Sequence, residues 1–388
     1  MQAALSSLPR MSSRLTLRDL SLALALFAVA AFFTFKVPDW NFISARNLSL
    51  LMIDFSITAT LAIGMLLVIL PGHIDLSAGS GVGLIGGIGA VLITNHHWPA
   101  AAALLTGLLV ALAIWSAMGT LIVKERIPAF IITLGGLLIF KGLFWRVIDN
   151  HTVPVVAGGQ HNLYSLLTTF YLPPAAGYAV AGMVVAGLVF LRLQSRAARL
   201  QHGFATDDGE LTFLQLFLAA QVVFLFVLVT NQFRGVPLPA LILGAVALVA
   251  WVITQHTPFG RYLYAIGGNE EAAVISGIPV ERVTIGAFTL MGAIVALTGF
   301  MQTAYGGSST TTVGDLMELD AVAACVIGGA SLKGGRGSVP GVLCGALIMA
   351  CLLNGMSLLA VEPEKKFMAR GVVLILAVWM DVRLARKG

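Results

Sequence analysis

Charged side chains are scarce in this sequence. Only 23 Lys and Arg and 18 Asp and Glu occur among 388 residues, which is 11%, whereas 58% of the residues are hydrophobic. Soluble domains carry roughly 25% charged residues, so there is too little polar surface here to cover a soluble globule. This scarcity argues against a soluble enzyme, a nucleic-acid-binding module and a disordered chain, and it favours a protein that lies in a membrane.

Cysteine is also rare, and the motifs of metal sites are missing. The three cysteines, Cys325, Cys344 and Cys351, lie in apolar or small-residue stretches without C-x-x-C spacing. We expect all three to be buried small residues rather than disulfide or zinc ligands. His96 and His97 are adjacent in a predicted turn, but no further ligands accompany them, so no metal site is expected.

Apolar runs of membrane-spanning length recur along the chain and predict an all-α polytopic membrane protein with about 10–12 transmembrane helices, some of them broken or re-entrant. Short loops leave no room for a soluble domain. We expect a terminal segment at 1–19, one transmembrane domain at 20–381, and a tail at 382–388. The candidate spans are 20–35, 51–70, 77–94, 100–123, 129–148, 172–191, 212–230, 238–254, 283–302, 320–332, 338–360 and 369–381.

The basic residues predict an orientation. With the N-terminus inside and the spans alternating, inside segments hold 15 Lys and Arg and outside segments hold 7. The remaining one, Lys141, lies within a span and can reach toward an interface. Cytoplasmic loops are enriched in these residues, so both termini are expected in the cytoplasm. The stretches 192–211 and 255–282 then face the cytoplasm, and the polar stretches 149–170 and 303–319 face outside.

The sequence has none of the motifs of an energy-converting or hydrolytic site. Neither a nucleotide-binding G-x-x-x-x-G-K-[ST] pattern nor H-E-x-x-H nor G-x-S-x-G occurs, so no catalytic residues are assigned. Acidic residues in or beside the spans are few: Asp54, Asp75, Glu318 and Asp320. Such residues are functional candidates in a membrane. For Asp75, a structural role, either capping of a broken helix or pairing with a nearby base, and proton coupling both stay open.

Two glycine-rich passages resemble each other and suggest two internally related halves. Residues 69–79 and 326–335 both run from an apolar segment through glycine, a polar residue and leucine to a second glycine. Transporters often contain repeats with glycine-interrupted helices at corresponding positions. The similarity is short, and a chance likeness of two glycine-rich turns is an equal alternative.

One short helix is predicted on the cytoplasmic side. Asn269 can cap its start, with Glu270 and Glu271 in the positively polarised first turn. Gly277 can end it in a left-handed conformation, and Pro279 blocks its continuation. A helix of about two turns is not stable alone in water, so we expect it to dock on a partner or on the chain's own spans.

Three separated motifs resemble the membrane permeases of monosaccharide ABC importers, the ribose, xylose and galactoside family, which is related to branched-chain amino acid permeases. They are Gly267-Gly-Asn-Glu-Glu-Ala-Ala-Val-Ile-Ser-Gly-Ile278, Gly72-His-Ile-Asp-Leu-Ser-Ala-Gly-Ser80 and Cys325-Val-Ile-Gly-Gly-Ala-Ser-Leu-Lys-Gly-Gly-Arg-Gly-Ser338. The resemblance runs from about residue 45 to the end. An extra helix pair at about 171–236 looks like that of xylose-type members, whereas His73 departs from the usual small residue or Glu.

The resemblance implies a bacterial inner-membrane permease that imports a pentose, with D-xylose as first candidate and ribose or galactose as alternatives. An ion-coupled secondary transporter is the alternative from another class. Implied partners are a second copy of the chain, membrane lipid, a periplasmic or lipid-anchored sugar-binding protein, and a cytoplasmic ATPase that carries ATP and Mg. No nucleic acid and no cofactor on this chain are implied.

The resemblance also assigns candidate residues. A coupling helix at about 268–278 would receive the ATPase, and two broken-helix elements would contribute to the pathway. The coupling residues are Gly268, Asn269, Glu270, Glu271, Ala272, Ala273, Ser276, Gly277 and Ile278; the pathway candidates are Gly72, His73, Asp75, Ser77, Gly328, Gly329 and Ser331.

Overall fold

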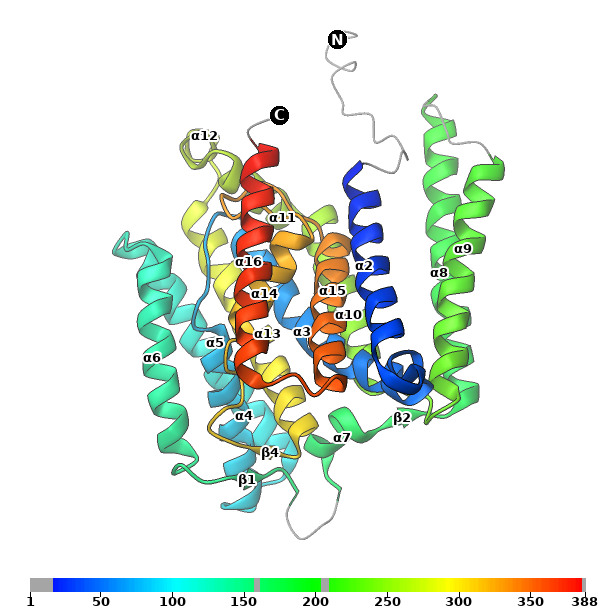
Figure 1. The fold of residues 1–388 in the computed structure, drawn as a ribbon. Coiled ribbons are helices and arrows are strands. Elements are labelled where there is room, and N and C mark those ends of the chain that lie inside the picture. Colours follow the sequence, from blue (N-terminus) through cyan, green and yellow to red (C-terminus); the bar gives the residue numbers. More distant parts are fainter. Residues whose placement is uncertain (1–16, 157–160, 204–208, 386–388) are drawn as a thin grey trace.

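A computed structural model describes residues 17–156, 161–203 and 209–385, which form a helical bundle (Figure 1). The helices are α2 (Leu17–Lys36), η1 (Pro38–Ile43), α3 (Ala45–Ile69), α4 (Ala78–Thr94), α5 (Ala100–Lys124), α6 (Ala129–Val147), α7 (Leu163–Thr169), α8 (Pro174–Gln201), α9 (Gly209–Asn231), α10 (Leu238–His256), α11 (Pro258–Gly268), α12 (Glu270–Ile275), α13 (Val280–Gly306), α14 (Met317–Ile327), α15 (Val339–Leu358) and α16 (Pro363–Ala385). The strands are β1 (Val153–Pro154), β2 (Tyr171–Leu172), β3 (Val236–Pro237) and β4 (Ser308–Ser309).

Each predicted span has a helix, which confirms the all-α polytopic class. Within the described residues, eight helices are long and apolar enough to cross a membrane. At 11 residues, α14 extends roughly 16 Å and is too short to cross a hydrocarbon core of about 30 Å. The bundle's terminal helices exceed their predicted bounds, because α2 begins at Leu17 and α16 continues to Ala385. Residues 1–16 and 386–388, at the two predicted tails, lie outside the described residues.

The centre of the bundle is α3, with α13 and α15 beside it. In the most apolar part of α3, 78% of the residues are buried inside the protein, compared with 61% in α13 and 50% in α15. Glycines of α4 let aromatic rings of its neighbours approach the backbone: Trp115 of α5 contacts Gly81, and Phe144 of α6 contacts Gly87. Small residues permit this close packing of membrane helices, which explains why α4 is rich in glycine.

The extra helix pair forms a peripheral hairpin. Helices α8 and α9 run antiparallel at one edge of the bundle (Figure 1), and only 11% of the apolar window of each is buried. Strands β2 and β3 pair at its base, with Tyr171 opposite Pro237 and Leu172 opposite Val236. A hairpin with so much exposed apolar surface fits a position facing lipid.

The two stretches predicted on the outside meet at the end of the bundle opposite α12. Val153 of β1 pairs with Ser309 of β4. The prediction of 149–170 as a polar stretch is incomplete, because α7 lies within it. Tyr164 of α7 is fully buried and donates a 2.8 Å hydrogen bond to the Gly86 carbonyl. Because this buried residue lies within a mostly polar stretch, the composition of 149–170 does not indicate that a helix packs there.

Two side chains differ from their predicted surroundings. Cys344 is exposed, so the prediction of three buried cysteines is wrong for this residue, while Cys325 and Cys351 are buried. Cys351 belongs to a cluster with Phe33, and Cys344, about two turns earlier in α15, lies outside it. Lys141 of α6 contacts the Asp315 carboxylate and donates a 2.9 Å hydrogen bond to the Thr311 carbonyl. It therefore pairs within the protein instead of only reaching toward an interface.

Candidate functional site

Two successive helices, α11 and α12, stand at one end of the bundle (Figure 1). The Thr257 side chain caps α11 by accepting a hydrogen bond from the Gly260 amide. The Asn269 side chain caps α12 by accepting a 2.9 Å bond from the Ala272 amide. Gly277 follows with φ of 78°. The short helix has the predicted start and stop signals, but at six residues it is shorter than two turns. Helix α11 was not predicted from the sequence, although Thr257-Pro258 is a typical helix start.

Helix α12 has one buried and one exposed face. Ala273 is buried, whereas Val274 is 57% exposed and Ile275 is 87% exposed. Glu270, Glu271, Ala272 and Ser276 are also exposed. Two adjacent apolar side chains, Val274 and Ile275, therefore lie on the exposed face of α12.

The segment before α12 contacts both glycine-rich loops through backbone. The Gly335 amide donates a 2.9 Å hydrogen bond to the Leu70 carbonyl. Gly267 lies against both of these groups so closely that a Cβ atom there would overlap them. Tyr264 of α11 donates a 2.9 Å hydrogen bond to the Gly337 carbonyl. We call this contact of 264–268, 70–72 and 333–337 the glycine junction. Through it, a displacement of α11 and α12 would reach the loops at the ends of α3 and α14.

The first loop of the junction breaks the chain between α3 and α4. Gly72 has φ of 93°. Asp75 is fully buried, and its Oδ1 accepts hydrogen bonds from the Ser77 amide (2.8 Å) and the Ser77 hydroxyl (2.6 Å). Its Oδ2 accepts a 2.6 Å bond from the Trp115 indole N–H. Both carboxylate oxygens thus accept hydrogen bonds, which supports a structural role over proton coupling, although the N-cap of α4 itself is Ser77.

The second loop joins α14 to α15. Gly329 has φ of 81°, and Gly328 packs against the backbone of Gly341 so closely that neither could carry a side chain. Ser331 is buried, its hydroxyl accepts a 3.3 Å hydrogen bond from the Lys333 amide, and its carbonyl accepts one from Gly334. These three predicted pathway residues therefore shape the loop. The structure brings the two similar glycine-rich passages together, whereas an origin from repeated halves stays a prediction.

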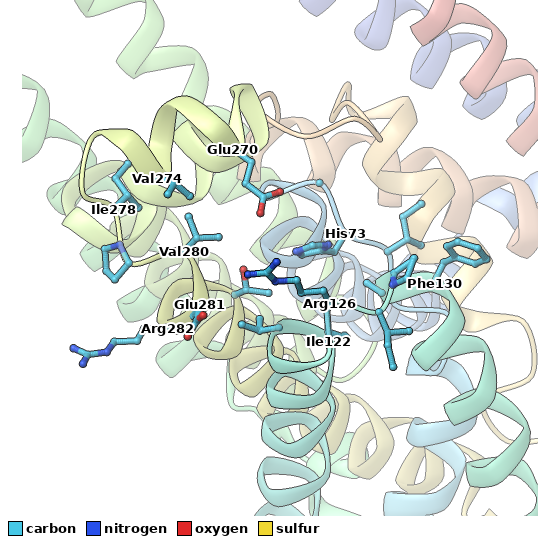
Figure 2. A pocket seen from close by; sticks show the side chains of 18 residues that line it. His73, Ile122, Arg126, Phe130, Glu270, Val274, Ile278, Val280, Glu281 and Arg282 are labelled. Atoms are coloured by element: carbon cyan, nitrogen blue, oxygen red, sulfur yellow. The ribbon is translucent and has the colours of Figure 1, made fainter.

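A cavity of about 880 Å³ lies beneath α12. Figure 2 shows Glu270 pointing into it toward His73 and Arg126. Ile278 lines it from the segment that follows α12. The His73 ring lies 6.1 Å from the ring of Phe288 on α13. Burial lowers the pKa of His73 below its usual value, and the negative charge of Glu270 opposes this shift, so the surroundings favour the neutral form of His73.

Several residues of this end were not found from the sequence. Trp115 and Tyr264 sit in apolar or aromatic stretches and contribute through a single polar atom, which no spacing rule reveals. Arg126 was counted only as an inside charge, yet it lines the cavity.

The Asn269 cap gives a direct test of the local structure. Replacing Asn269 by Ala removes the acceptor for the Ala272 amide, so we expect α12 to lose about 1 kcal/mol of helix stability. Hydrogen exchange measured by mass spectrometry should then be faster over residues 270–275. Asn269→Asp keeps an acceptor and should exchange like the wild type. Equal exchange in Asn269→Ala would show that tertiary contacts alone hold α12.

Comparison with known proteins identifies a family. A family model described as the permease component of the branched-chain amino acid transport system matches residues 47–378. The xylose transport system permease protein XylH of Escherichia coli (strain K12) is 37% identical over 363 residues, covering 94% of this chain and 91% of that protein. No solved structure was found to match the chain.

Further relatives share this similarity. XylH of Haemophilus influenzae is 38% identical over 366 residues, covering 94% of this chain and 96% of that protein. The ribose import permease protein RbsC of Escherichia coli (strain K12) is 33% identical over 344 residues, covering 88% and 87%. These matches confirm the resemblance seen in the motifs. The chain therefore belongs to this family of ABC transport-system permease components and is a multi-pass protein of the inner membrane.

Proposed function

We propose that this chain is the membrane-spanning permease of an ATP-driven importer that moves a pentose, first of all D-xylose, into the cytoplasm. The observation that carries the proposal is α12, a capped helix at the bundle end with exposed Val274 and Ile275. Its base contacts both broken-helix loops through the glycine junction. A partner that moves α12 would therefore also displace the two broken-helix loops inside the bundle.

The partner at α12 is a cytoplasmic ATPase subunit that binds ATP and Mg. The chain itself has no nucleotide-binding motif, and the family to which it belongs serves ABC importers. The count of 15 inside and 7 outside basic residues favours the orientation that puts α12 and both termini in the cytoplasm. At the opposite end, a periplasmic or lipid-anchored binding protein would deliver the sugar, and a second permease copy completes a homodimer in the lipid.

The relatives favour D-xylose over ribose. The two XylH proteins are 37% and 38% identical to this chain, whereas RbsC is 33% identical over a shorter range. In proteoliposomes that hold the permease, its ATPase and its binding protein, we expect unlabelled xylose to compete with labelled xylose better than ribose or galactose does. A reversed order would assign another monosaccharide.

Charge reversal on α12 tests the docking site. Glu270 and Glu271 are exposed in its first turn. We expect the double variant Glu270→Lys, Glu271→Lys to reduce both binding of the ATPase and ATP-dependent uptake by about tenfold or more, since reversing two charges at the proposed contact removes its electrostatic complementarity with the partner. The measurements are co-purification with the ATPase and sugar uptake.

The matched control is Glu210→Lys at the start of α9, in the peripheral hairpin. It changes the charge in the same sense without touching α12 and should leave assembly and uptake unchanged. If the double variant assembles and transports like this control, α12 is not the docking helix. Uptake driven by a pH gradient in vesicles that hold this chain alone would instead establish the ion-coupled alternative.

A further inference from the structure

A second cavity, of about 300 Å³, lies in the half of the bundle opposite α12. It is enclosed by α3, α13, α14, α15 and α16 and is lined mainly by polar side chains. Asp54, roughly 14 Å along α3 from its first residue, places the cavity within the membrane-spanning part of the bundle. Polar and ionisable groups at such a depth are costly unless they serve a function.

The cavity presents both donors and acceptors. Asp54 supplies carboxylate oxygens beside the Tyr305 hydroxyl. The Gln302 amide lines the wall from α13. Asn354 of α15 is held in place by two amide hydrogen bonds with Asn47, of 3.0 and 3.1 Å. The Asn354 amide keeps a second N–H and a second lone pair for another partner.

Hydrogen-bonding capacity is left unused at the wall. Asp320 is 5% exposed, and its Oδ2 pairs with Arg370 at 3.2 Å. Its Oδ1 and the Arg370 Nε are buried and have no partner among the described residues. Buried polar atoms are nearly always hydrogen-bonded, so this ion pair at the wall of the cavity keeps hydrogen-bonding capacity that no described residue uses.

The charges point to a neutral ligand with several hydroxyls. Asp320 is paired with Arg370, and Asp315, which also lines the cavity, is paired with Lys141. Asp54 is the carboxylate left without an opposite charge among the described residues of the wall. The described residues contain no group of three His, Cys, Asp or Glu side chains that could hold a metal ion. The volume matches the lower end of small-molecule pockets, roughly 300–1,000 Å³, which suits a single sugar ring.

We infer that this cavity is a monosaccharide-binding subsite inside the permease, in which Asp54, Gln302 and the Asp320–Arg370 pair bind sugar hydroxyls. The inference rests on the proposed function and adds to it that the permease itself holds the sugar during passage. The hydroxyls of the delivered sugar would then replace their hydrogen bonds to water with hydrogen bonds to these side chains, in the half of the bundle that faces the binding protein.

Saturation-transfer difference NMR on the full-length chain in lipid nanodiscs, with D-xylose as the probe and no binding protein, tests the subsite. We expect xylose ring-proton signals for the wild type, and Kd values about threefold to tenfold higher for Gln302→Leu and for Asp54→Ala, since each removes a hydrogen bond to a hydroxyl. The controls are Gln232→Leu and Glu125→Ala, both at exposed positions outside the cavity. They should bind like the wild type.

The outcomes are decisive in both directions. If the wild type gives no xylose signal, or if both cavity variants bind as tightly as the controls, the subsite is wrong. Should Asp54→Ala fail to fold, the half-buried Gln302 still provides the test. ATP-driven uptake by the wild-type importer tests the proposed function separately. If uptake is observed while the xylose-binding test fails, the chain is still an importer permease, but this cavity is not its sugar subsite.

Discussion

Replacing Gly267 by Ala will destabilise the permease, whereas the same change at Gly268 will not. A Cβ atom at Gly267 would overlap the Leu70 carbonyl oxygen and the Gly335 amide, and would lie 2.9 Å from the Gly334 carbonyl carbon. These are backbone atoms, which cannot rotate away as a side chain can. Overpacking of this kind costs about 1–3 kcal/mol, and separation of the Gly335 amide from the Leu70 carbonyl adds about 1 kcal/mol.

Gly268 is the matched control because it is the next residue of the same helix. A Cβ atom there meets nothing within 4 Å, and alanine is favoured over glycine in a helix. The thermal unfolding midpoint in detergent should therefore fall for Gly267→Ala and stay level or rise for Gly268→Ala. ATP-driven uptake should fall with the midpoint in the first variant. Equal midpoints in both variants would show that the glycine junction does not hold the two loops together.

The contrast between these neighbouring glycines marks the limit of prediction from sequence. In the sequence, Gly267 and Gly268 are equivalent members of one motif, and only Gly268 was among the candidate coupling residues. The feature that separates them is the approach of two loops about 200 and 70 residues away in the chain, at Leu70 and Gly335. Contacts over such separations leave no local signal.

The fold itself was largely predictable, since length and hydropathy determine a membrane-spanning helix. Local chemistry was equally predictable where the signal is in adjacent residues, as in the Asn269 cap and the left-handed Gly277. Segments whose anchor is a single residue were missed. Helix α7, which depends on buried Tyr164, is such a segment. The polar cavity was missed for another reason, because its lining residues come from five different helices that lie far apart in the chain.

Replacing Asp75 by Ala will strongly destabilise the chain. Asp75 is fully buried and accepts three hydrogen bonds, two from Ser77 and one from Trp115. Without the carboxylate, the Trp115 indole N–H and the Ser77 amide are left as buried donors, and each costs about 1–3 kcal/mol. We therefore expect a loss of about 3 kcal/mol or more, read as a lower unfolding midpoint and poor yield in the membrane.

A double-mutant cycle with Trp115→Phe separates this structural role from proton coupling. Phe fills most of the Trp115 volume but has no N–H, so the combined variant no longer leaves an indole donor unpaired. The two changes should therefore cost less together than the sum of the single changes, by about 0.5–3 kcal/mol. The control for Asp75→Ala is Glu125→Ala, at an exposed carboxylate with right-handed helical backbone angles. A proton site predicts another result. Asp75→Ala would then fold normally and lose only a pH-dependent transport step, and the unfolding free energies of the two single changes would simply add in the double variant. The non-additive outcome is expected because the Trp115 indole N–H donates directly to Asp75, so the two side chains share one buried hydrogen bond.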